Sequence, residues 1–127
     1  QTLRLPQAHL MRANFNAADL RDSDLGGSDL TWADLRSANF RNARLRGVVF
    51  DHATLADADL SRADLTGARF DGADLSNADL HGADLNGIEW RQMAAIQHAN
   101  LAGVRNAPNG FVAWAMGHGA VQELAAP

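Results

Sequence analysis

Large apolar residues recur at every fifth position of this chain, from Leu5 to Trp90. Residues 63–85, which read ADLTGARFDGADLSNADLHGADL, show the pattern most clearly, because an alanine stands two residues before each leucine or phenylalanine. An α-helix repeats after about 3.6 residues and a β-strand after about 2, so neither element places these side chains on one face. The period of five therefore excludes ordinary amphipathic helices and strands as the basis of the fold.

Eighteen of these units follow one another without a gap, which predicts a solenoid whose units bury their apolar side by stacking on one another. Glycine recurs at a longer period of twenty residues, so four units form one coil with a turn at each corner. Glycine suits the second central position of a type II turn, where φ is positive, and Asn42 and Asn77 can fill that position at other corners. The glycines of this set are Gly27, Gly47, Gly67 and Gly87.

The run of Ala-(Asp/Asn)-(Leu/Phe)-X-X units over about residues 3–90 resembles the pentapeptide-repeat family. The resemblance implies an all-β solenoid, the right-handed quadrilateral β-helix. Large and small apolar residues alternate toward the inside, so each coil is filled and leaves no lumen for a ligand. The repeats predict about four and a half coils, which at a strand-like spacing of roughly 4.8 Å give a rod about 22 Å long.

The chain divides into three predicted segments. The regular register fails after Trp90, because the ANL triplet at 99–101 stands one residue out of frame. A helix is predicted over about 110–118, with Asn109 as its N-cap and with its end at Gly117 or Gly119. The segments are a pentapeptide-repeat β-helix over 1–90, an irregular final coil and loop over 91–108, and a C-terminal helix and tail over 109–127.

The predicted helix carries apolar residues on two sides. An open solenoid end exposes apolar side chains and unpaired backbone, so one side is expected to cap the last coil. The second side, with Val121 and Leu124, is expected to pair with another copy, as the C-terminal segments of several members of the family do in end-to-end dimers. The alternative is a purely intramolecular cap. Candidate cap or dimer residues are Phe111, Val112, Trp114, Ala115 and Met116.

Several classes of function are excluded by what the sequence lacks. It has no cysteine, hence no disulfide framework and no thiolate chemistry. Its longest apolar stretches are a few residues, so no membrane-spanning segment is expected. We expect a bacterial cytoplasmic location, with a secreted effector as the alternative. The five histidines are scattered, and no catalytic triad, phosphate loop or metal-binding loop is present. We therefore expect no enzyme activity, no cofactor, no metal, no membrane attachment and no direct nucleic-acid binding.

The charges are unevenly distributed along the rod. Residues 1–50 carry seven arginines and five acidic residues, whereas residues 51–90 carry two arginines and nine acidic residues. These acids have two interpretations. They are either solvated side chains that bond nearby backbone N–H groups, or a mimic of DNA phosphates, as in family members that inhibit or protect DNA gyrase. The candidate acidic partner surface comprises Asp19, Asp57, Asp59, Asp64, Asp74, Asp79 and Asp84.

A second candidate surface is apolar. Met11, Trp32 and Val49 fall at outward positions on the face of Leu10, Leu30 and Phe50. Such a patch indicates either a partner surface or packing under an N-terminal segment that this chain lacks. The leading interpretation is a protein-interaction module, such as the C-terminal domain of a bacterial adaptor or effector. The alternative is a DNA mimic directed at gyrase or another topoisomerase.

Overall fold

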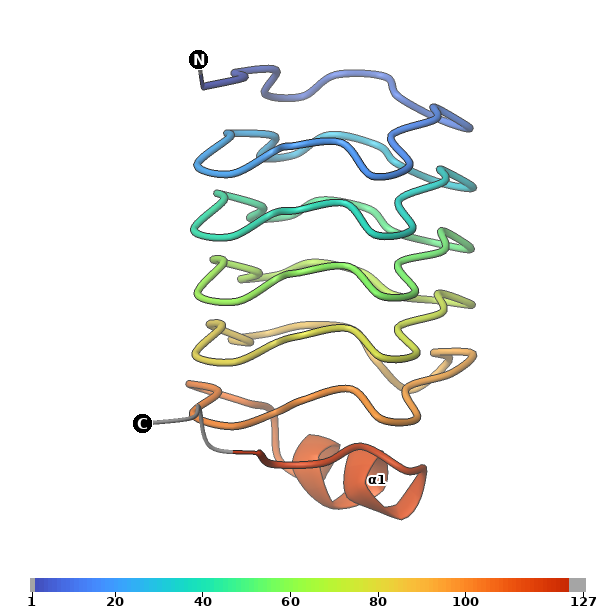
Figure 1. Ribbon diagram of the computed structural model, residues 1–127, viewed down its shortest axis with the longest axis vertical. Helices are drawn as coiled ribbons and strands as arrows, with labels where there is room; N and C mark the ends of the chain where they lie inside the picture. The colour runs from blue at the N-terminus through green and yellow to red at the C-terminus, as the bar shows by residue number, and fades with distance from the viewer. Residues whose placement is uncertain (1, 124–127) are drawn as a thin grey trace.

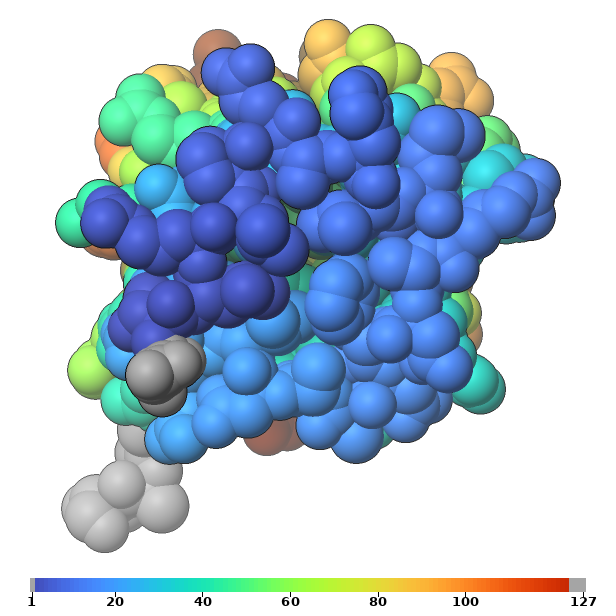
Figure 2. Space-filling model, turned by 90° about the horizontal axis from the view of Figure 1, so that it is seen from above, coloured from blue at the N-terminus to red at the C-terminus, as the bar shows by residue number. Residues whose placement is uncertain are grey.

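The computed structural model describes residues 2–123, and they form a stack of coils with a short helix beneath the last one (Figure 1). Parallel β-bridges join residues twenty apart, so that Asp59 bridges Asn39 in one neighbouring coil and Asp79 in the other. Four bridge positions fall in every twenty residues, which gives the stack four faces and the squarish outline seen from the N-terminal end (Figure 2). The bridges are single-residue contacts, and no longer strand is defined within residues 2–123.

The corners are four-residue turns closed by an i to i+3 hydrogen bond, such as Ser28 N–H to Leu25 O at 2.9 Å. The third residue of each turn has a positive φ, as predicted for Gly27 (71°) and Asn42 (60°). Non-glycine residues adopt the same conformation, including Ala17 (59°) and Trp32 (62°). The coil therefore imposes the left-handed conformation on almost every corner, even where the side chain disfavours it.

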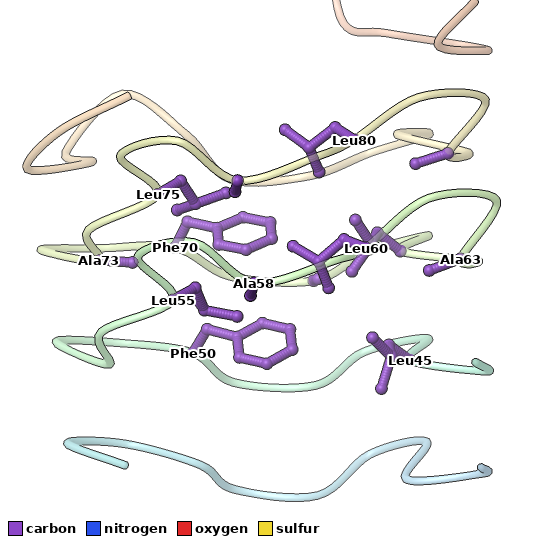
Figure 3. Packing of buried hydrophobic residues seen from close by; sticks show 14 of the residues in the cluster. Leu45, Phe50, Leu55, Ala58, Leu60, Ala63, Phe70, Ala73, Leu75 and Leu80 are labelled. Atoms are coloured by element: carbon purple, nitrogen blue, oxygen red, sulfur yellow. The ribbon is translucent and has the colours of Figure 1, made fainter. Parts of the chain in front are cut away.

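The interior is filled by the two alternating residue types. Leu65 and Ala63 are both fully buried, as the predicted inward pattern requires. Figure 3 shows large side chains of successive coils stacked over one another, with alanines beside them. Phe50 and Phe70 stack with ring centroids 5.2 Å apart and planes 10° from parallel. The core thus runs along the axis of the stack as one continuous column.

The ladder continues past Trp90 with one inserted residue. Arg69 bridges Glu89 at a spacing of twenty, whereas Asp74 bridges Ala95 at a spacing of twenty-one. The N–H groups of Ala94 and Ala95 both donate to Ala73 O, at 2.9 and 3.3 Å, which is the pattern of a bulge. Bridges at Asn100, Arg105 and Val121 carry the ladder beyond the regular units on which the estimate of four and a half coils was based.

The helix α1 spans Phe111–Gly117. The prediction of Asn109 as its N-cap is wrong, because the N-cap is Gly110 with φ 87° and no side chain caps the helix. Phe111 N–H donates to Pro108 O at 3.0 Å, so the chain enters the helix through a tight turn that places glycine at the left-handed position. No helix within residues 2–123 combines the length and apolar character needed to cross a bilayer.

After α1 the chain returns to the ladder. Gly119 has φ 96°, and Val121 then bridges Asn100, with Leu101 N–H donating to Val121 O at 2.8 Å. The Asn100 side chain also pairs with the backbone of Glu123, through bonds of 3.0 and 3.2 Å. Leu124, expected on the second side of the helical segment, lies outside the described residues.

Candidate functional site

The aspartates of the candidate acidic surface have a local structural role. Asp59 Oδ1 accepts a hydrogen bond from the backbone N–H of Ser61 at 2.9 Å, and Asp79 Oδ1 accepts one from His81 N–H at the same distance. The same contact to the residue two positions later recurs around the coils, because each outward residue precedes a corner. Within the candidate set, the residues that make it are Asp19, Asp59, Asp64, Asp74, Asp79 and Asp84.

Arginine neutralises part of this surface. Arg21 donates two side-chain hydrogen bonds to Asp19, at 2.8 and 2.7 Å, and these bonds lower the pKa of Asp19 to about 2. Arg46 lies 3.8 Å from the Asp64 carboxylate. Asp84 accepts a hydrogen bond from the Asn106 amide at 3.1 Å. Asp19 and Asp64 therefore present less free charge than the sequence pattern suggested, whereas Asp84 keeps its charge beside a neutral amide.

The remaining four aspartates of the set gather around one corner. Asp59 and Asp79 bridge each other on one face, Asp74 lies on the adjacent face, and Asp57 occupies the corner between them with φ 62°. Within residues 2–123, no arginine or histidine side-chain nitrogen lies within 4.0 Å of these carboxylates. We call this group the acidic corner, and its four carboxylates have no cation partner among the described residues.

A separate acidic group is held by Arg69. Its guanidinium lies 3.3 Å from Asp51, 3.1 Å from Asp71 and 3.7 Å from Glu89. These three acids surround one cation, whose pKa is raised chiefly by the charge of Asp51. Together with Arg69 they form a mixed-charge cluster. The twenty-residue spacing of Asp51 and Asp71 was the signal for this grouping.

The apolar candidate surface contains a stack of planar side chains. Trp32 is 52% exposed, and its indole lies between the Arg12 guanidinium, 5.7 Å from the ring centroid, and the His52 imidazole, 4.5 Å away. The next residue of this column is Gly72, and the His52 ring occupies the space that a Cβ there would need. We call the column of Arg12, Trp32, His52 and Gly72 the stacked corner.

The other predicted members of this patch lie near the column but outside it. Met11 is 55% exposed and directly precedes Arg12. Val49 is half-buried and forms β-bridges with Asp29 and Arg69 on its face of the stack. Sequence reasoning missed Arg12 and His52 as parts of the surface. Their spacing of twenty residues from Trp32 was the available signal, since it placed all three at the same corner.

The C-terminal candidates lie on two sides of α1. Phe111 and Ala115 are buried, and the Phe111 ring lies 5.6 Å from the ring of Trp90 in the last regular unit. Trp114 is half-buried and lies 5.3 Å from Trp90. Val112 is half-buried, and Met116 is 41% exposed. Within residues 2–123, no three acidic or histidine side chains come together in a way that could hold a metal ion.

Comparison with known families gives a match over most of this architecture. A family model described as pentapeptide repeats matches residues 4–31, 13–51, 28–67 and 49–87, with eight copies of the repeat. These segments together cover more than half of the chain. No curated protein matches the sequence.

Solved structures show the same architecture. A pentapeptide repeat protein (Rfr23) from the cyanobacterium Cyanothece 51142 is 22% identical, covers 96% of this chain and 86% of its own, and has a TM-score of 0.56. QnrB1, a plasmid-mediated fluoroquinolone resistance protein, is 20% identical over 96% of this chain, with a TM-score of 0.52. This chain spans only 61% of the QnrB1 chain. At these identities the two likenesses concern the fold alone.

Proposed function

Because this chain belongs to the pentapeptide-repeat family, we propose that it is a non-enzymatic scaffold that presents its outer surface to another protein. Its fold is the right-handed quadrilateral β-helix of that family. The core is filled by leucine, phenylalanine and alanine, so recognition takes place on the faces, corners and ends of the stack. We place this function in the bacterial cytoplasm, in a domain of an adaptor or effector.

The observation that carries the proposal is Trp32. An indole that is 52% exposed contributes little to the core, and a bulky residue at φ 62° is unfavourable for the backbone. Gly72 occupies the equivalent corner two coils away, where it adopts φ 70° without a side chain. Exposed tryptophan beside exposed Met11 is typical of surfaces that bind a partner protein.

Affinity capture with matched variants tests this proposal. The intact chain and Trp32→Gly are used as baits in a bacterial lysate, and the captured proteins are identified by mass spectrometry. Trp32→Gly removes the indole and suits the positive φ, so the fold is retained. His98→Gly is the control, because it makes the same backbone change at another exposed corner with φ 62°.

We expect at least one protein to be captured by the intact chain and by His98→Gly but not by Trp32→Gly. If all three baits capture the same set of proteins, the stacked corner is not the partner surface. A set that differs only for His98→Gly would move the surface to the corner column of Asp57, Asn77 and His98, toward the C-terminal end of the stack.

The acidic corner supports the second candidate function, DNA mimicry directed at gyrase. Four carboxylates without a cation partner in the described part of the chain leave a concentrated negative surface at one corner, and phosphate charge is what a gyrase-directed mimic must reproduce. The double variant Asp59→Asn, Asp79→Asn tests it. Asn39 Oδ1 accepts the Arg41 N–H at 3.0 Å, so asparagine retains the local bond and removes only charge.

The readout is gyrase supercoiling with the purified chain. DNA mimicry predicts inhibition or protection of gyrase that weakens in the double variant, whereas the scaffold proposal predicts no effect of either protein. We expect no effect at high micromolar concentration. Inhibition by the intact chain that the double variant loses would replace the scaffold proposal with the DNA mimic.

We also propose that α1 caps the C-terminal end and that its outer side forms a homodimer. The buried contacts of Phe111 and Ala115 support the cap, because they cover apolar side chains that the last coil otherwise exposes. Met116, 41% exposed, and half-buried Val112 support the dimer, since they leave an apolar strip facing away from the core.

A further inference from the structure

A surface hollow lies at the C-terminal end of the stacked corner. It has a volume of about 280 Å³, and the residues that line it are Asp71, Ile88, Glu89, Trp90, Arg91 and Gln92. Gly72 N–H donates to Gln92 O at 2.7 Å, so Gln92 is the next position of the column that begins at Arg12. The hollow therefore continues the stacked corner by one coil. We call it the lower hollow.

One rim of the lower hollow carries more negative than positive charge. Asp71 and Glu89 belong to the group of three acids around Arg69, and Asp51 is the third. Arg69 donates hydrogen bonds to Asp51 at 3.3 Å and to Asp71 at 3.1 Å. It lies 3.7 Å from Glu89, which is an ion-pair distance without a hydrogen bond. One guanidinium thus serves three carboxylates, and Glu89 is the least satisfied of them.

Glu89 also lacks the local bond that the other acids at its position in the repeat make. Each aspartate that stands before a large apolar residue in the described chain accepts a bond from the N–H two positions later, as Asp29 Oδ1 does from Thr31 at 3.0 Å. Within residues 2–123, Glu89 accepts no such bond from Arg91 N–H. Its side chain is 59% exposed, so this free carboxylate is accessible from outside.

Trp90 contributes a second unsatisfied group. It is 7% exposed, and its Nε1–H has no hydrogen-bond partner within residues 2–123. The Arg91 guanidinium covers its ring, 4.9 Å from the centroid, and forms no ion pair in the described part of the chain. Buried donors are nearly always bonded, so the indole indicates a missing acceptor at the hollow that Trp90 lines. A ligand for the lower hollow therefore brings a cation for Glu89 and an oxygen for Trp90.

We propose that the lower hollow binds an arginine residue of the partner protein, and this inference rests on the proposed function of the stacked corner. The arginine guanidinium pairs with Glu89 and Asp71 from the solvent side. A backbone carbonyl next to that arginine accepts the Trp90 Nε1–H. Arginine fits better than lysine, because its planar fork donates to two carboxylates at once.

Charge and continuity select this occupant. The group around Arg69 has three carboxylates and one guanidinium, which leaves an excess of negative charge for a basic side chain to neutralise. The hollow is continuous with Trp32 through His52 and Gly72, so one extended segment covers both. Trp32 stands two coils from Gly72 and three from Glu89, or roughly 10–14 Å at ~4.8 Å per coil. Because an extended chain rises about 3.3 Å per residue, the partner carries an apolar residue for Trp32 about four positions from the arginine.

The probes are the capped peptides Leu-Ser-Ser-Ser-Arg and Arg-Ser-Ser-Ser-Leu, which present the same pair of side chains in both chain directions. Their controls carry citrulline in place of arginine, which keeps the shape and removes the charge. Binding to the intact, isotope-labelled chain is followed by NMR, which gives the Kd. We expect one arginine peptide to bind about three- to tenfold more tightly than its citrulline control, because only the arginine pairs with the carboxylates. The indole N–H resonance of Trp90 should move on binding.

Glu89→Gln tests the charge of the lower hollow. Glutamine has the same length, and the exposed Glu89 side chain accepts no hydrogen bond within residues 2–123, so the fold is retained. This variant should bind the arginine peptide only as tightly as the intact chain binds the citrulline peptide. Asp79→Asn is the matched control, because it removes one negative charge from another face and should leave the Kd unchanged. Trp32→Gly should weaken the arginine and citrulline peptides by the same factor, because it removes the apolar contact alone.

Four results overturn the proposal: no binding of either arginine peptide at millimolar concentration, an equal Kd for arginine and citrulline, equal weakening by Glu89→Gln and Asp79→Asn, or a Trp90 resonance that does not move. A Kd that Trp32→Gly leaves unchanged overturns the link to the stacked corner. The proposed function fails differently, through lysate capture that does not depend on Trp32. Capture that depends on Trp32 together with an equal peptide Kd retains the scaffold and refutes the arginine site.

Discussion

The imidazole ring of His52 lies on the indole ring of Trp32, with ring centroids 4.5 Å apart and planes 14° from parallel. The two residues are twenty positions apart, and neighbouring coils of a β-ladder are separated by roughly 4.8 Å. This spacing is close to the 4.5 Å between the two ring centroids. The solenoid therefore stacks planar side chains at a corner without distorting the backbone, and it holds Trp32 in a fixed orientation at the surface.

Gly72 is predicted to be required beneath this stack. A Cβ at Gly72 would overlap the His52 ring, and φ there is 70°, so Gly72→Ala adds a steric conflict to the left-handed backbone penalty. Gly87→Ala is the matched control, because φ is 67° and the nearest atom to its Cβ is Gly67 N at 3.9 Å. We expect each variant to lose about 1–2 kcal/mol from the backbone penalty, and Gly72→Ala to lose more.

Urea unfolding of the two glycine variants measures the difference, and near-UV circular dichroism reports the orientation of the tryptophans. Equal unfolding free energies with an unchanged near-UV spectrum would show that the His52 ring moves freely off Gly72.

The core prediction concerns the two residue types of one unit. Leu65 and Ala63 are both fully buried between coils on either side. Leu65→Ala should cost about 2–5 kcal/mol, because stacked coils cannot collapse around the cavity. Ala63→Leu should cost about 1–3 kcal/mol through overpacking. Urea denaturation of both variants checks this, and two neutral substitutions would contradict the assignment of either residue to the interior.

The sequence was sufficient to predict the core and the β-ladder, because both follow from the repeat periods of five and twenty residues. Leu65 and Ala63 point inward and Asp59 bridges Asp79, as periods of five and twenty require. The one-residue shift after Trp90 was also visible in the sequence. The features that follow from backbone repetition alone were therefore predictable.

Features that depend on the direction of a side chain could not be predicted from the sequence. Arg69 stands in a column of outward residues, but its contacts with Asp51 and Asp71 depend on which way a long side chain turns across the coils. The stack of Trp32 on His52 depends on rotamers in the same way. Asn109 was assigned as the N-cap from local propensity, but the turn from Pro108 into α1 places Gly110 at that position.

The pair Asp34 and Arg36 gives a prediction for pH. Arg36 donates side-chain bonds of 2.9 and 2.8 Å to Asp34, and these bonds lower the pKa of Asp34 from 3.8 to about 2. We expect NMR titration to give that pKa, and Arg36→Gln to raise it toward 3.8. Because the folded pKa lies below the unfolded one, the stabilisation is complete above about pH 4 and is lost as the pH falls through 2.

Asp34→Asn isolates this charge effect. Asparagine at the equivalent position Asn39 makes the same bond to the backbone N–H two residues later, so the variant retains the corner. The difference in urea midpoint between the intact chain and Asp34→Asn should be constant from pH 7 to 5 and should shrink toward pH 2. It should also be small, since exposed ion pairs contribute little. A difference that does not change with pH would contradict the assigned pair.

The last prediction concerns the two sides of α1. A chain that ends at Asn109 lacks Phe111 and Ala115, which are buried against the end of the core, so we expect it to be less stable and prone to aggregate. The intact chain is expected to be a dimer by light scattering. Met116→Glu places a charge on the exposed apolar side and should give a folded monomer, because Met116 is 41% exposed.

Ala113→Glu is the control for Met116→Glu, since Ala113 is also exposed on α1 but lies one residue after Val112, about 100° further round the helix. It should remain a dimer. The two functions of α1 then separate cleanly, because the cap requires only the buried side and the dimer requires only the exposed one. A monomeric intact chain refutes the dimer, and a truncated chain as stable as the intact one refutes the cap.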